Sequence, residues 1–324
     1  MMPWLLSGLG LVILLLAGDA LVRGAVNLSL RLGVPALIVS LTIVAFGTSA
    51  PELLIAINAL LEQKPGLALG NVVGSNTANV LLVLGIPAIM AGLHTSEIDT
   101  RKNYLVMIGA TLVFIGLAFR GEFDLIAAAV LLAFLAYVLG DAFFQARSHR
   151  KSSLESSSEE TMDDEEGDVE GADPDMPFWQ IIVFLLLGLV GLPLGADLLV
   201  KNASIIASNF GVSDAVIGLT LVAFGTSLPE LATTVMAAIR KNADVALGNV
   251  IGSNMFNLLA IIGIASLVGT IPVDPKFLRF DLWVMLASSL ILIPFVFMKI
   301  NINRFWGLGL TALYVVYVVK VLTH

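Results

Sequence analysis

The sequence predicts an all-α polytopic membrane protein with ten transmembrane helices in two inverted five-helix repeats. Three observations support this fold class. The 324 residues are 58% hydrophobic and only 13% charged, whereas a soluble domain has about 25% charged residues. Several apolar stretches reach the ~20 residues that cross a bilayer. Residues 19–86 and 197–264 share 30 identities over 68 positions without a gap, so the chain contains two related halves.

The hydropathy pattern places the helices in order along the chain. We expect them at residues 3–22, 35–62, 67–92, 103–119, 122–145, 177–200, 213–240, 245–270, 280–298 and 303–322. The first stretch lacks the basic residues of a signal peptide and has a counterpart in the second half, so it is interpreted as a helix. The second, third, seventh and eighth helices are long and interrupted.

The chain divides into a first transmembrane repeat at residues 1–146, a linker at 147–176 and a second repeat at 177–324. Within the linker, residues 152–175 hold 11 of the 25 acidic residues and no Lys or Arg. Such a composition is typical of a disordered, solvated segment. It lacks the spaced oxygen ligands of a calcium-binding loop. The absence of cysteine excludes disulfides and thiolate metal sites.

The charge distribution predicts how the helices are oriented. Five helices in each half make the second half enter the membrane from the opposite side, so the repeats are inverted. Lys and Arg collect in cytoplasmic loops, and 11 of the 17 follow odd-numbered helices. We therefore expect both termini outside and the acidic linker in the cytoplasm. Inverted repeats with interrupted helices are typical of secondary transporters, which bind their ligand near the membrane midplane and alternate access to it.

A glutamate directly follows a proline in each repeat, in the stretches FGTSAPEL (46–53) and FGTSLPEL (224–231). An ionised carboxylate at the centre of a membrane helix costs at least about 2.5 kcal/mol, so Glu52 and Glu230 need a compensating charge. No Lys or Arg lies within either helix. Pro51 and Pro229 interrupt the backbone hydrogen bonds and are expected to free carbonyls near Ala45, Gly47 and Thr48 and near Ala223, Gly225 and Thr226.

The second repeated motif, GNVVGSNTAN and GNVIGSNMFN, puts polar residues on one helical stripe. At 100° per residue, Asn71, Ser75 and Asn79 lie within about 80° of one another. Asn249, Ser253 and Asn257 repeat the stripe. Together the motifs offer two carboxylates, hydroxyls, amides and carbonyls, which are the ligands of a hard cation such as calcium. Sodium is close to calcium in size, so the same oxygens can hold either ion.

With these two motifs, each present twice at an offset of 178 residues, the chain resembles the calcium/cation antiporter superfamily, specifically its prokaryotic sodium/calcium exchanger branch. The resemblance covers the whole chain. It implies exchange of calcium for sodium in a prokaryotic cell (inner) membrane, with no cofactor, no nucleic-acid partner and no enzymatic activity. The implied metal-site residues are Glu52, Glu230, the carbonyls of Thr48 and Thr226, Ser49, Ser227, the carbonyls of Ala45 and Ala223, Ser75, Ser253 and Asn79, with Asn257 at the matching position.

Asn257 stands where some members of the superfamily, including the potassium-dependent exchangers, have aspartate. By resemblance this argues against potassium dependence. The proton/calcium branch has a GNxxE pattern, whereas this chain has Gly74 and Gly252 at the fifth position. Proton/calcium exchange is nevertheless the alternative function, followed by a passive cation channel. An intramembrane hydrolase is not expected, because His94, His149 and His324 all fall outside the predicted spans.

Other polar residues have structural interpretations. Asn71, Asn76, Asn249 and Asn254 fit either the ion site or amide bonds between helices. Asp19 and Asp197 each precede a basic residue by four positions, Arg23 and Lys201, and are interpreted as surface salt bridges at helix ends.

Overall fold

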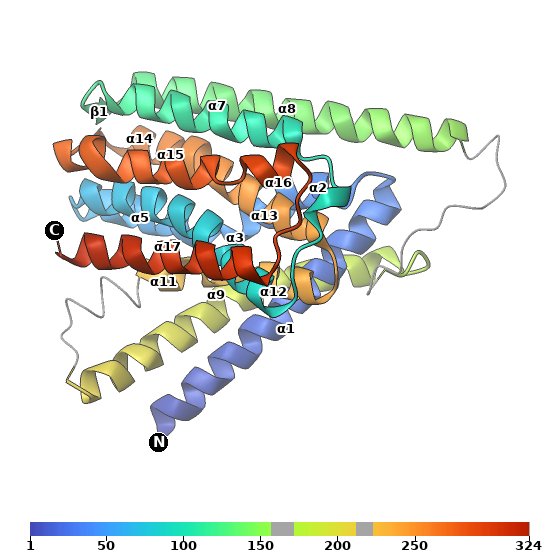
Figure 1. Cartoon of the computed structure of the whole chain (residues 1–324), viewed down its shortest axis with the longest axis horizontal. Helices are drawn as coiled ribbons and strands as arrows, with labels where there is room; N and C mark the ends of the chain where they lie inside the picture. The colour runs from blue at the N-terminus through green and yellow to red at the C-terminus, as the bar shows by residue number, and fades with distance from the viewer. Residues whose placement is uncertain (157–171, 212–222, 324) are drawn as a thin grey trace.

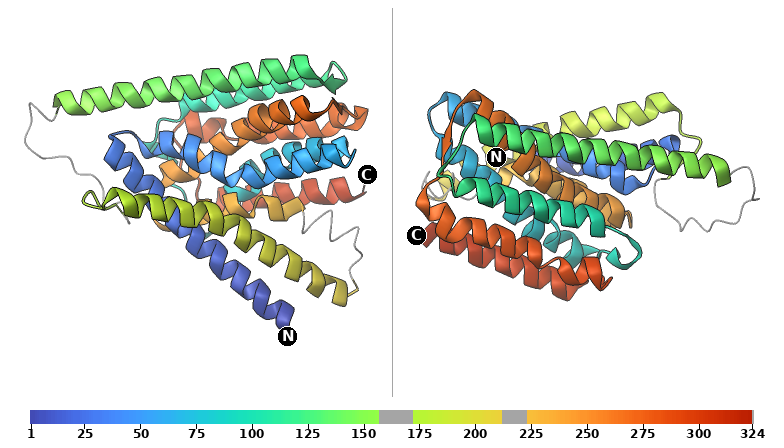
Figure 2. Two further views of the ribbon diagram at one scale, coloured as in Figure 1. Left: turned by 180° about the vertical axis from the view of Figure 1, so that it is seen from behind. Right: turned by 90° about the horizontal axis from the view of Figure 1, so that it is seen from above.

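The computed structural model describes residues 1–156, 172–211 and 223–323 as a bundle of helices (Figures 1 and 2). The first half contains α1 (Met2–Leu32), α2 (Ala36–Val39), η1 (Ser40–Val44), α3 (Ala45–Thr48), α4 (Ala50–Leu61), α5 (Pro65–Ala78), η2 (Asn79–Val83), α6 (Gly85–Met90), η3 (Thr95–Glu97), α7 (Arg101–Ala118), β1 (Glu122–Phe123) and α8 (Leu125–Ser156).

The described part of the second half also begins with a long helix. It contains α9 (Phe178–Asn209), α11 (Ala223–Thr226), α12 (Leu228–Ile239), α13 (Ala243–Phe256), η5 (Asn257–Ile261), α14 (Ile262–Val268), β2 (Ile271–Pro272), η6 (Phe277–Asp281), α15 (Leu282–Leu290), α16 (Ile293–Phe297) and α17 (Arg304–Thr323).

Eight helices in the described part of the chain are long and apolar enough to cross a membrane, or nine if the bent pair Ala36–Thr48 and Ala50–Leu61 is one span. The expected seventh helix, 213–240, falls partly on residues 212–222, outside the described residues. The last part of this expected helix is present as the shorter apolar helix Leu228–Ile239. The ten-helix count stays a prediction.

Three expected helix ends were too early. The first helix continues to Leu32, where Gly33 ends it in a left-handed conformation at φ 66°. The sixth continues to Asn209 and the fifth to Ser156, so α8 extends into the segment assigned to the linker. Sequences rich in Ala, Leu and Arg continue a helix beyond its apolar span, and hydropathy alone marks only the span.

The two long helices α1 and α9 lie side by side and run obliquely to the rest of the bundle (Figure 1). Small residues allow this close crossing. A Cβ on Gly10 would meet the backbone of Leu199 at 2.7 Å, and one on Gly188 would meet Leu21 at 2.5 Å. Gly10 and Gly188 occupy equivalent positions in the two halves, so each half supplies the same packing residue to the crossing.

The helices that carry the two repeated motifs form the centre of the bundle. The span Pro65–Met90 is 83% buried and Ala243–Val268 is 89% buried, whereas no other candidate span exceeds 39%. Both central spans contain a π-helical turn that begins at an asparagine, Asn79 in η2 and Asn257 in η5. Such turns are frequent at functional sites, and here the polar stripes lie on the most buried helices at a local irregularity.

Short backbone pairings join the halves at both ends of the bundle. In the two-stranded sheet, Glu122 pairs with Pro272 and Phe123 pairs with Ile271. At the other end, Leu93 pairs with Ile302 in an isolated antiparallel bridge. Leu93 and Ile271 are equivalent positions, so the same contact occurs twice with the halves exchanged.

Candidate functional site

Each repeated glutamate lies in the first turn of a new helix. The chain breaks at Ser49 between α3 and α4, with a bend of 40°. In the second half it breaks at Ser227, between α11 and α12. Pro51 occupies one of the first two positions of α4, where its missing N–H costs nothing and its φ favours the helix. The proline therefore starts a helix and places the following carboxylate at its positive end.

Glu52 and Glu230 are brought together in the centre of the protein. Each is only 1% exposed. The hydroxyl of Ser49 donates to Oε1 of Glu230 at 3.3 Å, which connects the break in the first half to the carboxylate of the second. Both oxygens of Glu52 and Oε2 of Glu230 lack a hydrogen-bond partner.

The hydroxyls of Thr48 and Thr226 face the polar stripe of the opposite half. Thr48 Oγ1 donates to Oδ1 of Asn249 at 3.2 Å and lies 3.3 Å from Oγ of Ser253. Thr226 Oγ1 donates to Oδ1 of Asn71 at 3.3 Å. Each helix break is therefore held against the partner half by equivalent bonds. Ser75 is the counterpart of Ser253, and both are buried.

Asn79 and Asn257 lie in segments that pack against the helices of the two glutamates. The segment η2 packs against α12, which carries Glu230, and η5 packs against α4, which carries Glu52. Both asparagines are 1% exposed, and the Oδ1 atom of each has no hydrogen-bond partner.

Unpartnered oxygens concentrate at these residues. In the described part of the chain, thirteen buried side-chain nitrogen and oxygen atoms lack a hydrogen-bond partner. Six are oxygens of the predicted site: Oε1 and Oε2 of Glu52, Oε2 of Glu230, Oδ1 of Asn79, Oδ1 of Asn257 and Oγ of Ser227. A buried acceptor without a partner costs about 1–3 kcal/mol, and more if it is charged. Several in one place favour a cation that binds them together.

The chemistry of these oxygens matches a hard cation. No group of three His, Cys, Asp or Glu side chains is found among the described residues, so acidic ligands at the site are limited to the two glutamates. The remaining oxygens are neutral amides and hydroxyls. Calcium accepts six to eight oxygens in irregular geometry, whereas transition metals prefer imidazole or thiolate.

A cavity of about 190 Å³ lies beside the helix breaks. It is lined by residues of α4, α9, α11 and α12: Pro51, Ile55, Pro193, Ala196, Asp197, Val200, Gly225, Thr226 and Pro229. Both prolines that precede the glutamates belong to its lining, so the cavity reaches the turns that carry the carboxylates.

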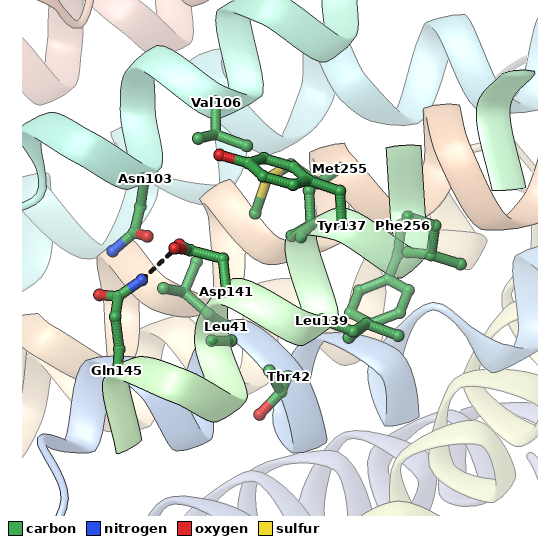
Figure 3. Close-up of a pocket in the computed structure, with 13 residues that line it drawn as sticks. Leu41, Thr42, Asn103, Val106, Tyr137, Leu139, Asp141, Gln145, Met255 and Phe256 are labelled. Atoms are coloured by element: carbon green, nitrogen blue, oxygen red, sulfur yellow. Dashed lines mark hydrogen bonds between the residues drawn. The ribbon is translucent and has the colours of Figure 1, made fainter. Parts of the chain in front are cut away.

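A second, much smaller cavity of about 20 Å³ lies between α7, α8, η1 and α13 (Figure 3). Its acid, Asp141, accepts hydrogen bonds from Lys102 and from Gln145, each at 2.6 Å. The other labelled side chains are mainly apolar, among them Leu41, Met255 and Phe256. Because its carboxylate is already paired, this cavity is a packing defect beside the site rather than an ion site.

One expectation about the backbone is wrong. The carbonyl of Ala45 is not free, because it accepts a bond from the N–H of Ser49 at 3.1 Å. Helical hydrogen bonding of α3 therefore continues up to Ser49, and the new helix α4 begins at the next residue. Ala223 begins α11 at the equivalent position.

The two surface salt bridges are present, and one of them includes a third, unexpected residue. Asp19 pairs with Arg23 at 3.0 Å and Asp197 pairs with Lys201 at 2.8 Å. Asp19 also binds Arg240, at the end of α12 in the other half. Sequence spacing reveals pairs four residues apart within a helix, whereas Arg240 is 221 residues away. The only feature of the sequence that marks Arg240 is that the equivalent residue of the first half, Glu62, has the opposite charge.

Comparison with known proteins shows the family of the chain. The sequence model of the family described as sodium/calcium exchanger protein matches residues 2–143 and 180–323. The chain belongs to this family. Members of the sodium/calcium exchanger family are membrane transporters, so the expectation that the chain is not an enzyme is confirmed.

Two curated relatives and one solved structure illustrate the similarity. The putative antiporter CaxA of Alkalimonas amylolytica is 34% identical, over 88% of this chain and 86% of its own. The sodium/calcium exchanger MaX1 of Methanosarcina acetivorans is 35% identical, over 96% of both chains. A structure of the sodium-calcium exchanger NCX_Mj soaked with sodium and calcium ions superposes with a TM-score of 0.79, at 30% identity over 98% of both chains. The resemblance to a prokaryotic sodium/calcium exchanger is therefore confirmed.

Proposed function

We propose that this exchanger moves calcium across a prokaryotic cell membrane in exchange for sodium, at one site between its two halves. The observation that supports it is the set of buried, unpartnered oxygens around Glu52 and Glu230. Two ionised carboxylates neutralise one calcium ion, and they also attract sodium. The two ions compete for the same oxygens, and this competition couples their transport.

The proposed ligands fall into three kinds. The carboxylates of Glu52 and Glu230 supply the charge. Neutral side-chain oxygens complete the coordination, and backbone carbonyls next to the helix breaks add further oxygens. The full set is Glu52, Glu230, Ser49, Ser227, Ser75, Ser253, Asn79 and Asn257, with the carbonyls of Thr48, Thr226, Ala45 and Ala223. The Ala45 oxygen would use the lone pair that the Ser49 N–H leaves free.

The proposed mechanism is alternating access by two inverted five-helix repeats. The sequence repeat and the paired contacts between halves support it, because elements related in this way can exchange their arrangements. In this structure the cavity next to Asp197 leads toward the prolines of both breaks, and the ion pair of Asp19 with Arg240 holds α1 against α12 on the other side. We place both termini and the cavity outside, and the acidic linker in the cytoplasm.

The test is calcium uptake by purified protein in liposomes with a sodium gradient as the driving force. We expect uptake that follows the sodium gradient in size and direction and that generates a membrane potential if three sodium ions exchange for one calcium. Each elementary charge moved is worth about 2.3 kcal/mol per 100 mV, so an imposed voltage should change the final calcium ratio.

Two controls separate the alternative functions. Uptake that follows a pH gradient and ignores sodium would replace sodium by protons as the exchanged ion. Calcium flux that continues without any counter-ion, with single-channel currents, would indicate a channel. The variants Glu52→Gln and Glu230→Gln should remove uptake in every case in which these carboxylates bind the ion.

A further inference from the structure

Four buried asparagines, two from each half, form a hydrogen-bonded group at the contact between the two central spans. Nδ2 of Asn79 donates to Oδ1 of Asn254 at 3.0 Å. The equivalent bond runs in the opposite direction, from Nδ2 of Asn257 to Oδ1 of Asn76, also at 3.0 Å. Each of the four is 1% exposed, so no water competes for these amides. Each bond joins one half to the other.

Two backbone carbonyls determine how all four amides are turned. Nδ2 of Asn76 donates to the carbonyl of Asn254 at 3.3 Å, and Nδ2 of Asn254 donates to the carbonyl of Asn76 at 3.4 Å. A carbonyl only accepts hydrogen bonds, so the atoms facing it must be the NH₂ groups. The Oδ1 atoms of Asn76 and Asn254 must then face the other two asparagines.

The remaining orientations follow from this. Because Asn254 presents an oxygen to Asn79, the amide group of Asn79 must present its NH₂, and its own Oδ1 must point away. The same holds for Asn257 opposite Asn76. These are the Oδ1 atoms that lack a hydrogen-bond partner, and η2 and η5 pack against the helices of the two glutamates.

We propose that Asn76 and Asn254 are positioning residues, each of which fixes the ion-facing amide oxygen of the opposite half. Asn76 orients Asn257, and Asn254 orients Asn79. This inference rests on the proposed function, since it assigns the oriented oxygens to the calcium site. It also separates the asparagines of the motif GSNxxN into two roles, with the last one a ligand and the earlier one its support.

The side-chain groups of both supporting asparagines already have hydrogen-bond partners. Oδ1 of each already accepts a bond from its partner asparagine. Nδ2 of each donates to a carbonyl and also contacts a methionine sulfur, Met285 at 3.8 Å for Asn76 and Met107 at 3.9 Å for Asn254. The two methionines occupy equivalent positions in the halves. The support for each ligand is therefore complete without an ion.

The crossed arrangement gives a distinctive test by double-mutant cycles. The measurement is equilibrium binding of radioactive calcium to the purified full-length protein in detergent, which needs no sodium gradient. Asn76→Ala should weaken calcium binding about 10- to 100-fold, as loss of a group that orients a metal ligand does. In the Asn257→Ala background, Asn76→Ala should lower calcium affinity less than about threefold, because the oxygen that Asn76 orients is already gone.

The matched control uses the nearer residue on the same helix. In the Asn79→Ala background, Asn76→Ala should keep its full effect, although position 79 is only three residues away. Equal losses in the two backgrounds would overturn the proposal and make Asn76 a ligand or a general packing residue. If Asn76→Ala does not fold, the equivalent cycle of Asn254→Ala with Asn79→Ala and with Asn257→Ala tests the same point.

In a third background, Asn76→Ala should change calcium affinity in the opposite direction. In Asn257→Asp both side-chain atoms are oxygens, so orientation no longer matters, and one of them faces Oδ1 of Asn76 unfavourably. Asn76→Ala should then strengthen calcium binding rather than weaken it. A further loss would contradict the proposal. Absence of calcium binding by the wild type would instead refute the proposed function, and the inference with it, so the two failures are distinguishable.

Discussion

The two halves of this exchanger are nearly interchangeable at the centre and differ at the ends of their helices. At the centre, the four asparagines make the same bonds with the halves exchanged. At the ends, Asp19 binds Arg240 across the halves, while its counterpart Asp197 has Lys201. The counterpart of Arg240 is Glu62, which pairs instead with Lys64 at 2.9 Å.

This difference separates two requirements. An ion that leaves toward either side needs the same ligands in both states, and a symmetric centre supplies them. A protein with fully symmetric ends would favour neither state, because exchanging the halves would convert one into the other. Under the proposed alternating access, the asymmetric ion pair would select which state is populated. Its energy would then shift the equilibrium between the two states rather than the affinity for the ion.

A smaller asymmetry lies beside the glutamates themselves. Nδ2 of Asn249 donates to the carbonyl of Glu230 at 3.3 Å and to Oγ1 of Thr234 at 3.2 Å. Nδ2 of the equivalent Asn71 lacks a partner among the described residues. The reason is in the sequence, since the counterpart of Thr234 is Ala56.

The largest expected effect is the loss of a carboxylate. At an effective dielectric constant near 20, two unit charges 4 Å apart interact by about 4 kcal/mol, so losing a carboxylate from a divalent ion should lower calcium affinity at least about a thousandfold. Glu52→Gln should exceed Glu230→Gln, because both oxygens of Glu52 are unpartnered while Ser49 already binds one oxygen of Glu230. Equilibrium calcium binding measures both variants. Equal losses would show that Ser49 does not distinguish the halves.

Next in size is the ion pair of Asp19. It is largely shielded from solvent, with side-chain exposures of 11% for Arg240 and 20% for Asp19. Breaking it should cost about 1–2 kcal/mol, a change of 5- to 30-fold in the ratio of the two states. The chain has no cysteine, so spin labels on Leu32→Cys and Ile239→Cys report the distance between α1 and α12 directly. Arg240→Gln should enlarge the population with the longer distance.

The matched control for this experiment is Glu62→Gln, at the equivalent position of the first half. It breaks an ion pair whose side chains are 62% and 65% exposed, and exposed pairs contribute little. The two distance populations should stay as in the wild type. A shift as large as that of Arg240→Gln would mean that any charge change at these helix ends biases the equilibrium.

The sequence alone indicated which buried polar residues the structure brings together better than it predicted the ends of the helices. Glu52, Glu230 and the polar stripes were found because an internal repeat, a helical period and the cost of a buried charge all concern residues near one another in the chain. The close approach of Glu52 and Glu230 followed from the two related halves. These inferences use local spacing and solvation, which the sequence carries directly.

The missed features depend on contacts between distant residues. Arg240 meets Asp19 only because α1 packs on α12, and no local rule brings them together. The pairing of Asn76 with Asn257 required the register between α5 and α13. The Ala45 carbonyl was expected to be free because proline breaks a helix. However, helical hydrogen bonding continues up to Ser49, whose N–H donates to that carbonyl.

A smaller effect is expected from making the two halves alike at the amide of Asn249. Thr234→Ala copies Ala56 of the first half and removes one of two bonds to Nδ2 of Asn249. Thermal unfolding should show a loss of about 1 kcal/mol, with calcium affinity changed less than threefold, since the bond to the Glu230 carbonyl remains. The reciprocal Ala56→Thr offers Asn71 a partner. A large loss of calcium affinity in Thr234→Ala would place Thr234 in the site.

The smallest effect concerns how the last helix of each half begins. Asp124 accepts from the N–H groups of Ile126 and Ala127 at the start of α8, while Asn303 caps α17 in the same way. Bonds from the Ala127 N–H and from Arg120 hold the pKa of Asp124 below its usual 3.8. A lowered pKa stabilises the folded state above the usual value, and this contribution is lost as the pH falls through the lowered one. Asp124→Asn should therefore lower the unfolding temperature slightly at pH 7, and the difference from the wild type should vanish in the acid range below 3.8. A difference that persists there would show that the substitution acts through something other than the charge of Asp124.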